Sequence, residues 1–332
     1  MLGAGVDSGL SRAVRRCLVL AVLVVAPLAA AVAAAPAGAS VAGGAGAGRT
    51  PLVVQGGHAT TPLTTRPHAA TTGYDMVGSD GGVFVFGQAG GFYGSLPGLN
   101  IHVTNVVGMV GSADGKGYFL VGSDGGVFSF GDTQFEGSLP GLGIKVHNIV
   151  GLVPSSDDRG YFLVGSDGGV FAFGDAVFEG SLPGNGVSTN SVVSIAGTPD
   201  NRGYWVLLSS GTIYNFGSAP NLGSLSCPAG YVCGNTVSIV STYTGLGVWV
   251  VDNYGFVYNL GDAPYWGGRP ASDNTGGPPT DIVSIVPTGD DGGYLLVGSD
   301  GGLFAFGDAA FHGSLPSLGI SVTNIVGAVP TA

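Results

Sequence analysis

The sequence predicts an all-β fold in which six similar units of short antiparallel strands form a closed ring. One phrase, Gly-Tyr-Phe-Leu-Val-Gly-Ser-Asp-Gly-Gly-Val-Phe, occurs unchanged at residues 117–128 and again at residues 160–171. Related phrases make six units, and their first residues are 43 to 46 positions apart. A period of this length, built of short strands, is typical of the blades of a β-propeller. The six phrases begin at Gly73, Gly117, Gly160, Gly203, Gly247 and Gly293.

The unit at residues 146–183 illustrates the four strands that we expect in each blade. Asp167-Gly168 stands between two apolar runs, which predicts a two-residue hairpin because both residues must adopt positive φ. Polar or Gly- and Pro-containing stretches separate the other runs, and no helical periodicity follows the N-terminal region. The expected strands are residues 146–153, 161–164 and 170–173, with a short outer strand at 177–182.

The order of the strands predicts how the ring closes. The repeated region begins at Tyr74 with a second strand and ends with a lone first strand, residues 322–329. This last strand finds a partner if it completes the blade that begins at Tyr74, and such a shared blade removes exposed strand edges. We therefore predict a six-bladed propeller over residues 73–332, preceded by a flexible lead-in at residues 40–72 that could add a strand.

The N-terminal region has the features of an export signal. A short basic stretch precedes an apolar run from Cys17 to about Ala35, and small residues follow as far as Ala39. Basic start, apolar run and A-x-A site together predict a secretory signal peptide at residues 1–39. Retention of the run as a membrane anchor is the alternative. We expect a secreted, extracellular protein, with the cell wall as a candidate location.

Composition narrows the possible partners. The formal net charge is -11, and an acidic surface repels phosphate backbones, so we expect no nucleic-acid partner. The 64 glycines follow no three-residue period, which favours tight turns over collagen. No second apolar run of spanning length follows the leader, so we expect no membrane contact once the signal is cleaved. We also expect a monomer. The sequence indicates no cofactor other than calcium.

The repeat phrase extended to residues 160–176 ends in Val-Phe-Ala-Phe-Gly-Asp-Ala. In this form it resembles a β-propeller repeat of exported actinobacterial proteins, where the repeat often accompanies cell-wall or hydrolase domains. The resemblance covers about residues 73–332 and implies a propeller fold and an export route. It supplies no catalytic residues that could be transferred to this chain.

Cysteine usage predicts one local disulfide. Cys17 leaves with the signal peptide, so Cys227 and Cys233 remain, in a loop that also contains Pro and Gly. In an oxidising compartment such a pair forms a disulfide that restrains the loop. Zinc binding is less favoured because no histidine lies close to the pair in the sequence.

Aspartates recur at two places in each unit. The first set precedes the hairpin glycine in four units and gives way to Ser210 and Tyr254 in the other two, which suits a turn better than a metal site. The second set follows the third strand and is expected on the same face as the acidic loops between first and second strands. Clustered carboxylates could bind calcium, although turn capping explains them more simply. The calcium candidates are Asp157, Asp158, Asp175, Asp290 and Asp291.

The fourth and fifth units depart from the repeat together, and this is where we expect a ligand. The loop between them holds the two cysteines, the following loop is enlarged, and Tyr254 replaces the hairpin Asp. Strand order predicts that these features share one face, opposite the acidic loops. Aromatic rings beside Arg and Asp suit stacking and hydrogen bonding to sugars, or a protein anchor. The candidate ligand-binding residues are Tyr231, Tyr254, Tyr265, Trp266, Arg269 and Asp273.

Two functions follow from these observations. The first is an extracellular binding or scaffold module for a cell-envelope glycan or a protein, acting through the loops of blades four and five. The alternative is a calcium-dependent hydrolase or lactonase that uses the propeller channel. First strands such as Ile-Val-Gly-Leu-Val are small and apolar, which favours the binding module, and we predict no catalytic residue.

Overall fold

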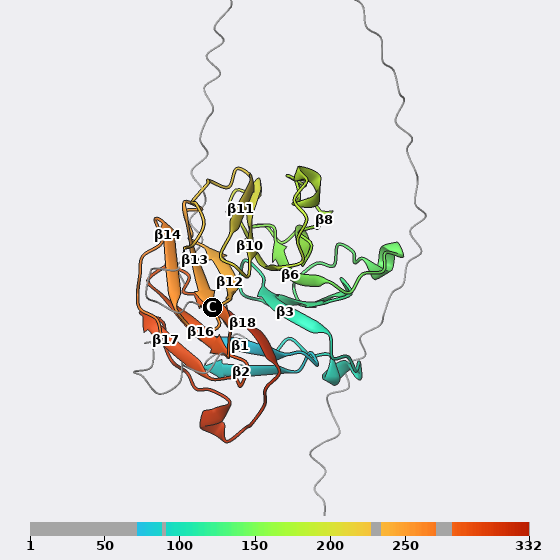
Figure 1. The fold of residues 1–332 in the computed structure, drawn as a ribbon. Coiled ribbons are helices and arrows are strands. Elements are labelled where there is room, and N and C mark those ends of the chain that lie inside the picture. Colours follow the sequence, from blue (N-terminus) through green and yellow to red (C-terminus); the bar gives the residue numbers. More distant parts are fainter. Residues whose placement is uncertain (1–71, 88–90, 227–233, 270–280, 332) are drawn as a thin grey trace, which may run out of the picture. The chain divides into compact units, whose positions relative to one another are not determined.

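The computed structural model describes residues 72–87, 91–226, 234–269 and 281–331. In this part the chain forms eighteen strands in six antiparallel sheets of three strands, with four short 3-10 turns (Figure 1). No helix among the described residues has the length and apolar character needed to cross a membrane. The predicted signal peptide and nearly all of the predicted lead-in lie outside the described residues.

Each sheet has a first, a middle and a third strand, and we number the sheets by their middle strands in chain order. The first strands are β18 (Ile325–Thr331), β3 (Val106–Gly111), β6 (Ile149–Pro154), β9 (Val192–Gly197), β12 (Thr236–Ser241) and β15 (Ile282–Pro287). The middle strands are β1 (Gly73–Gly78), β4 (Gly117–Gly122), β7 (Gly160–Gly165), β10 (Gly203–Leu208), β13 (Gly247–Asp252) and β16 (Gly293–Gly298). The third strands are β2 (Val83–Gly87), β5 (Val127–Gly131), β8 (Val170–Gly174), β11 (Ile213–Gly217), β14 (Val257–Gly261) and β17 (Leu303–Gly307).

Sheet 1 joins the two ends of the described chain. Its order is β18-β1-β2, and β18 runs antiparallel to β1 with Gly73 opposite Thr331 and Met76 opposite Ala328. The last strand therefore pairs with the unit that begins at Tyr74, as the strand order in the sequence predicts. First strands also contact one another, β3 with β6 and β18 with both β3 and β15, and Figure 1 places them inside the third strands.

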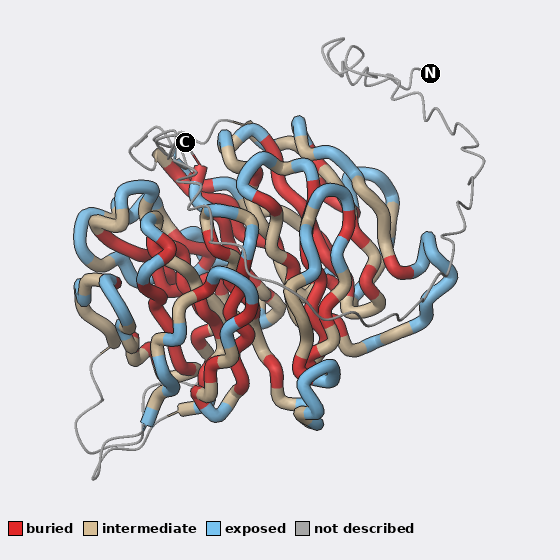
Figure 2. Tube along the Cα trace, turned by 90° about the horizontal axis from the view of Figure 1, so that it is seen from above, coloured by how far each residue is buried: buried red, intermediate tan, exposed pale blue. Residues whose placement is uncertain are grey.

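The hydrophobic core lies between neighbouring sheets. All six residues of every middle strand are buried, which agrees with the apolar character of these strands on both faces (Figure 2). One cluster packs Val77 of sheet 1 against Leu120 of sheet 2, and further clusters connect the following pairs of sheets. A sixth cluster packs Met76 against Leu295 and so connects sheet 6 with sheet 1.

The predicted fourth strand was wrong: each described sheet has three strands. After the third strand a glycine takes a positive φ, +133° at Gly180, which L residues rarely adopt and which turns the chain out of strand geometry. The Gly180 carbonyl then accepts the hydroxyl of Tyr204 in the next sheet, not a strand amide. Leu182, fully buried, covers the hairpin glycine Gly168. This outer segment leads into a 3-10 turn in four units: η1 (Pro97–Leu99), η2 (Pro140–Leu142), η3 (Pro183–Asn185) and η4 (Pro316–Leu318).

Candidate functional site

The loops gather at two ends of the sheets. At the hairpin end, middle strands turn into third strands, and Arg269 N–H donates to the Gly255 carbonyl of the β13–β14 hairpin. At the acidic end, first strands turn into middle strands, and Thr288 Oγ1 lies 2.9 Å from Asp290 Oδ1 and 3.1 Å from Asp308 Oδ1. The predicted gathering of both sets of acidic loops at one end is therefore confirmed for sheet 6.

The repeated hairpin aspartates act as turn residues. Asp124 Oδ1 accepts the N–H of Gly126 at 3.0 Å, and Asp167 does the same for Gly169. This side-chain-to-backbone bond closes a local turn and uses the carboxylate oxygen that a metal ion would need. The geometry agrees with the structural interpretation of this set.

The calcium candidates at the acidic end hold loops together. Asp157 accepts from Ser155 Oγ at 2.9 Å, and Asp175 lies over Gly160 at the start of β7. Asp158 and Asp291 have φ near +60° and accept backbone N–H groups from the preceding sheet, at Ala113 and Tyr243. Hydrogen bonds from Gly292 and Thr288 lower the pKa of Asp290. Among the described residues no three His, Cys, Asp or Glu side chains gather closely enough to hold a metal ion.

The first strands carry no ionisable side chain in any of the six sheets. Their half-buried positions hold residues such as Val150, Gly151 and Ser194. Ser194 Oγ is in turn an acceptor for the N–H of Ile239 in sheet 5. Carboxylates, imidazoles and amines are the usual groups of acid–base catalysis, and none of them stands on a first strand.

The β13–β14 hairpin, in the fifth unit, is rebuilt around Asp252. This carboxylate is fully buried, and Oδ1 accepts the N–H groups of Tyr254 and Phe256, both at 3.0 Å. Oδ2 accepts the N–H of Gly234 at 3.0 Å and the hydroxyl of Tyr258 at 3.2 Å. These four donors satisfy both buried oxygens in place of water. Asp252 thus does the work of the hairpin Asp that Tyr254 replaces.

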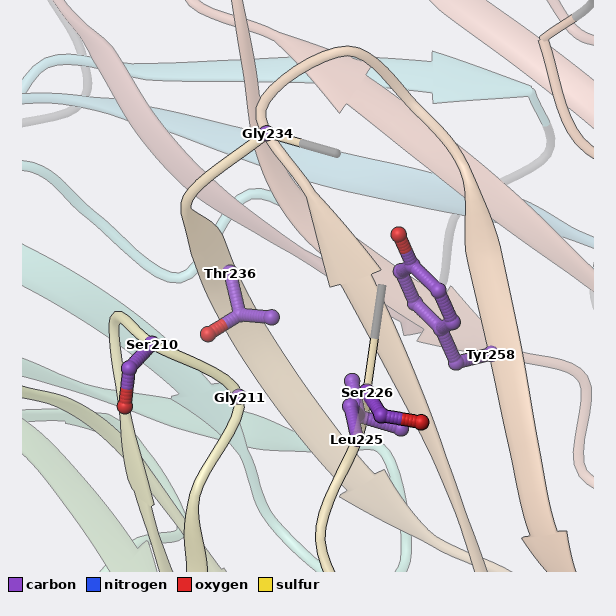
Figure 3. Close-up of a pocket in the computed structure, with 7 residues that line it drawn as sticks. All are labelled: Ser210, Gly211, Leu225, Ser226, Gly234, Thr236 and Tyr258. Atoms are coloured by element: carbon purple, nitrogen blue, oxygen red, sulfur yellow. The ribbon is translucent and has the colours of Figure 1, made fainter. Parts of the chain in front are cut away.

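A small pocket of about 50 Å³ opens at the hairpin end between sheets 4 and 5 (Figure 3). Figure 3 shows the Tyr258 ring and Leu225 from one side and Thr236 from the other. Burial and the nearby Asp252 carboxylate raise the pKa of Tyr258 to about 12, so its hydroxyl keeps its proton. The lining residues are Ser210, Gly211, Leu225, Ser226, Gly234, Thr236 and Tyr258.

The junction of sheets 4 and 5, which holds the pocket at its hairpin end, also differs from the others in how its two sheets are joined. At five junctions a middle-strand tyrosine donates its hydroxyl to a glycine carbonyl of the neighbouring sheet's outer segment; we call this the tyrosine contact. At the junction of sheets 4 and 5 the position belongs to Val248, which has no hydroxyl. The tyrosine contacts are Tyr74–Gly313, Tyr118–Gly94, Tyr161–Gly137, Tyr204–Gly180 and Tyr294–Gly267.

Arg269 takes part in packing at the junction of sheets 5 and 6. Its N–H bonds Gly255 as the N–H of Leu139 bonds Gly125, so it occupies the position of the buried leucine in other units. The guanidinium pairs with Asp281 at 2.7 Å and lies 4.7 Å from the centre of the Phe304 ring. At this junction an Arg–Asp pair thus replaces the Leu–Asn pair that is found at the junction between sheets 1 and 2. The side chain is 11% exposed and has few atoms left for a ligand.

The structure does not bring the described members of the predicted ligand set into one patch. Tyr254 lies at the hairpin end, whereas Trp266 donates its Nε1–H to the Asp291 carbonyl at the acidic end. Tyr265, 58% exposed, occupies the position of the exposed Phe135 and belongs to a regular row of outer aromatic residues, not to a local deviation. Tyr231, Asp273, Cys227 and Cys233 lie outside the described residues, and so does the predicted disulfide.

Sequence reasoning missed Asp252, Tyr258, Ser210 and Thr236. A signal was present for Asp252, because most sibling strands end in Gly at this position, for example Gly122 and Gly165. Tyr258 carried no such signal, since Tyr214 occupies the same place in β11. Trp205 and Trp249 are fully buried, as expected of core residues. No protein-family model and no curated protein matches this chain in the comparisons made.

Proposed function

We propose that the chain is an exported six-bladed β-propeller with three-stranded blades, and that it acts as an extracellular binding or scaffold module. Support for the ring comes from sheet 1, which contains strands from both ends of the described chain. It comes also from the packing of Met76 on Leu295 and from the tyrosine contact between Tyr74 and Gly313, which repeat the links between consecutive sheets. A closed ring leaves its first strands paired on one side and packed together on the other.

The ligand-binding site of this module is the hairpin end of sheets 4 and 5. The pocket beside Tyr258 is the observation that carries this proposal, because it opens at the junction of sheets 4 and 5, the junction whose middle strand has Val248 in place of the tyrosine. Four hydroxyl side chains and the leucine of the lining present donors, acceptors and an apolar wall together. This combination suits a hydroxyl or acetyl substituent of a cell-envelope glycan, or a small side chain of a protein partner.

Binding of the purified secreted chain to soluble peptidoglycan fragments and a glycan panel tests the proposal. The key variant is Tyr258→Phe, which removes one hydroxyl from the lining. Tyr214→Phe is the matched control, because Tyr214 holds the same repeat position in β11 outside the pocket. We expect weaker glycan binding in Tyr258→Phe and unchanged binding in Tyr214→Phe, with both variants folded by circular dichroism.

A protein ligand is the second arm of the same experiment. If no glycan binds, cell-envelope proteins are tested against the same pair of variants. Equal effects of Tyr258→Phe and Tyr214→Phe in both arms would place the binding site elsewhere on the chain.

A further inference from the structure

Asp75 is an acid at a repeat position where the other middle strands carry large apolar side chains. The siblings are Phe119, Phe162, Trp205, Trp249 and Leu295. The Asp75 side chain has no solvent exposure, and within the described part of the chain neither of its oxygens has a hydrogen-bond partner. An ionised carboxylate is strongly disfavoured in such surroundings, whereas the neutral acid is tolerated.

Asp75 lies inside the sheet that joins both ends of the described chain. On β1 it stands between Val329 of β18 and Val85 of β2. Both neighbours are apolar and cannot compensate a negative charge. A negative charge on Asp75 acts on the pairing of β1 with β18. In the other five sheets the corresponding first and middle strands are consecutive in the sequence.

The ionisable groups near Asp75 lie in the outer segment of its own unit and in sheet 2, and they do not supply a positive partner. Tyr93 and Tyr118 interact electrostatically with its carboxylate, and burial together with this charge raises the pKa of both hydroxyls. The charged groups beyond Tyr93 are Asp114, Asp132 and Lys116, and Lys116 Nζ pairs with Asp114 at 2.8 Å. On the opposite face of β1, the ring of His312 lies 5.9 Å from that of Tyr74.

We propose that Asp75 makes the pairing of β1 with β18 sensitive to pH. The neutral acid is compatible with the packed sheet 1, and loss of its proton destabilises the pairing of β18. Burial raises the pKa of Asp75 to about 7, so the change falls between acidic and mildly alkaline conditions. The same position in the other five sheets is apolar, so the effect is confined to sheet 1. In the exported protein that we propose, the pairing of β1 with β18 is therefore most stable in an acidic medium.

Hydrogen exchange of the full chain at about pH 5 and about pH 8.5 tests the proposal, after correction for intrinsic exchange rates. In the wild type we expect β1 and β18 amides to exchange on the order of 10- to 100-fold faster at the higher pH. Amides of β7 serve as the internal reference and keep their rates. In Asp75→Asn the difference between the two pH values disappears, because the amide cannot ionise.

Two further variants keep the test decisive. Asp75→Leu places the side chain of Leu295 at this position and replaces Asp75→Asn if that variant does not fold. His312→Gln removes the imidazole beside Tyr74 and should retain the wild-type response. An unchanged response in the Asp75 variants, its loss in His312→Gln, or equal acceleration of β7 would overturn the proposal.

Discussion

The hydroxyl of Tyr74 donates a hydrogen bond to the backbone carbonyl of Gly313, although 239 positions separate the two residues in the sequence. The same hydroxyl accepts the N–H of His312 at 3.0 Å. Tyr161 makes the corresponding pair of bonds with Gly137 and Glu136, only 24 and 25 positions away in the sequence. The first and last described units are thus linked by the same chemistry as consecutive units.

This relationship predicts equal costs for removing either hydroxyl. Tyr74→Phe and Tyr161→Phe should each lower the free energy of unfolding by about 1–2 kcal/mol, because a buried carbonyl loses its donor. Urea denaturation followed by fluorescence measures the change, with Tyr214→Phe as the control. A cost at Tyr161 without one at Tyr74 would show that the two ends are not joined in solution.

The Arg269–Asp281 pair should behave as a unit. Asp281→Asn leaves a guanidinium that is largely buried without its carboxylate, and we expect a loss of about 2–3 kcal/mol. Arg269→Leu combined with Asp281→Asn restores the Leu–Asn pair of sheets 1 and 2 and should recover most of that loss. A double-mutant cycle by chemical denaturation measures the coupling. Additive effects of the two changes would contradict it.

Asp252 should be far more sensitive than its sibling aspartates. Asp252→Asn replaces an acceptor oxygen that faces N–H and O–H donors with an NH₂ group, and we expect a loss of about 2 kcal/mol. Asp124→Asn, at a half-buried turn with one such bond, should stay within about 0.5 kcal/mol. Thermal unfolding of both variants makes the comparison. A similar cost at both positions would mean that Asp252 is only a turn residue.

Overall stability should fall as pH rises, through Asp75. Burial raises the pKa of this acid from 3.8 to about 7 in the folded chain. Its contribution to stability is therefore fully present below about pH 4 and is lost as the pH approaches 7. The loss is of the order of 4 kcal/mol at most. Denaturation of wild type and Asp75→Leu between these pH values isolates this contribution, since other carboxylates, such as the exposed Asp114 with its lowered pKa, are common to both.

Much of the fold could be predicted because its signals are local. Asp167-Gly168 does mark a hairpin, but the expected positive φ at both residues was wrong, because only Gly168 adopts one, +78°. The pairing of β18 with β1 followed from counting strands. The outer strand could not be predicted correctly from its residues alone. At Gly180 the chain bends, and the Gly180 carbonyl accepts a hydrogen bond from the Tyr204 hydroxyl of the next sheet. Nothing beside Gly180 in the sequence indicates that partner.

The candidate site was predictable only in its location. Departures from the repeat pointed to units four and five, where the pocket and Asp252 lie. The residues expected there behaved differently: Arg269 packs against Phe304, and Trp266 reaches the opposite end of the sheets. The type of a side chain and its position in the repeat do not show whether it already packs against, or forms a hydrogen bond with, a neighbouring sheet.

The repeating unit, its hairpins, its all-β character and the partner of its last strand could be established from local sequence patterns, because alternation and turn chemistry act between residues close in the chain. The folded chain was needed to show that the sheets have three strands, that Asp252 replaces a missing turn residue and that Asp75 is buried without a hydrogen-bond partner. These outcomes depend on groups one or more repeats away. Their energies arise from burial and hydrogen bonding between sheets, which no local pattern records.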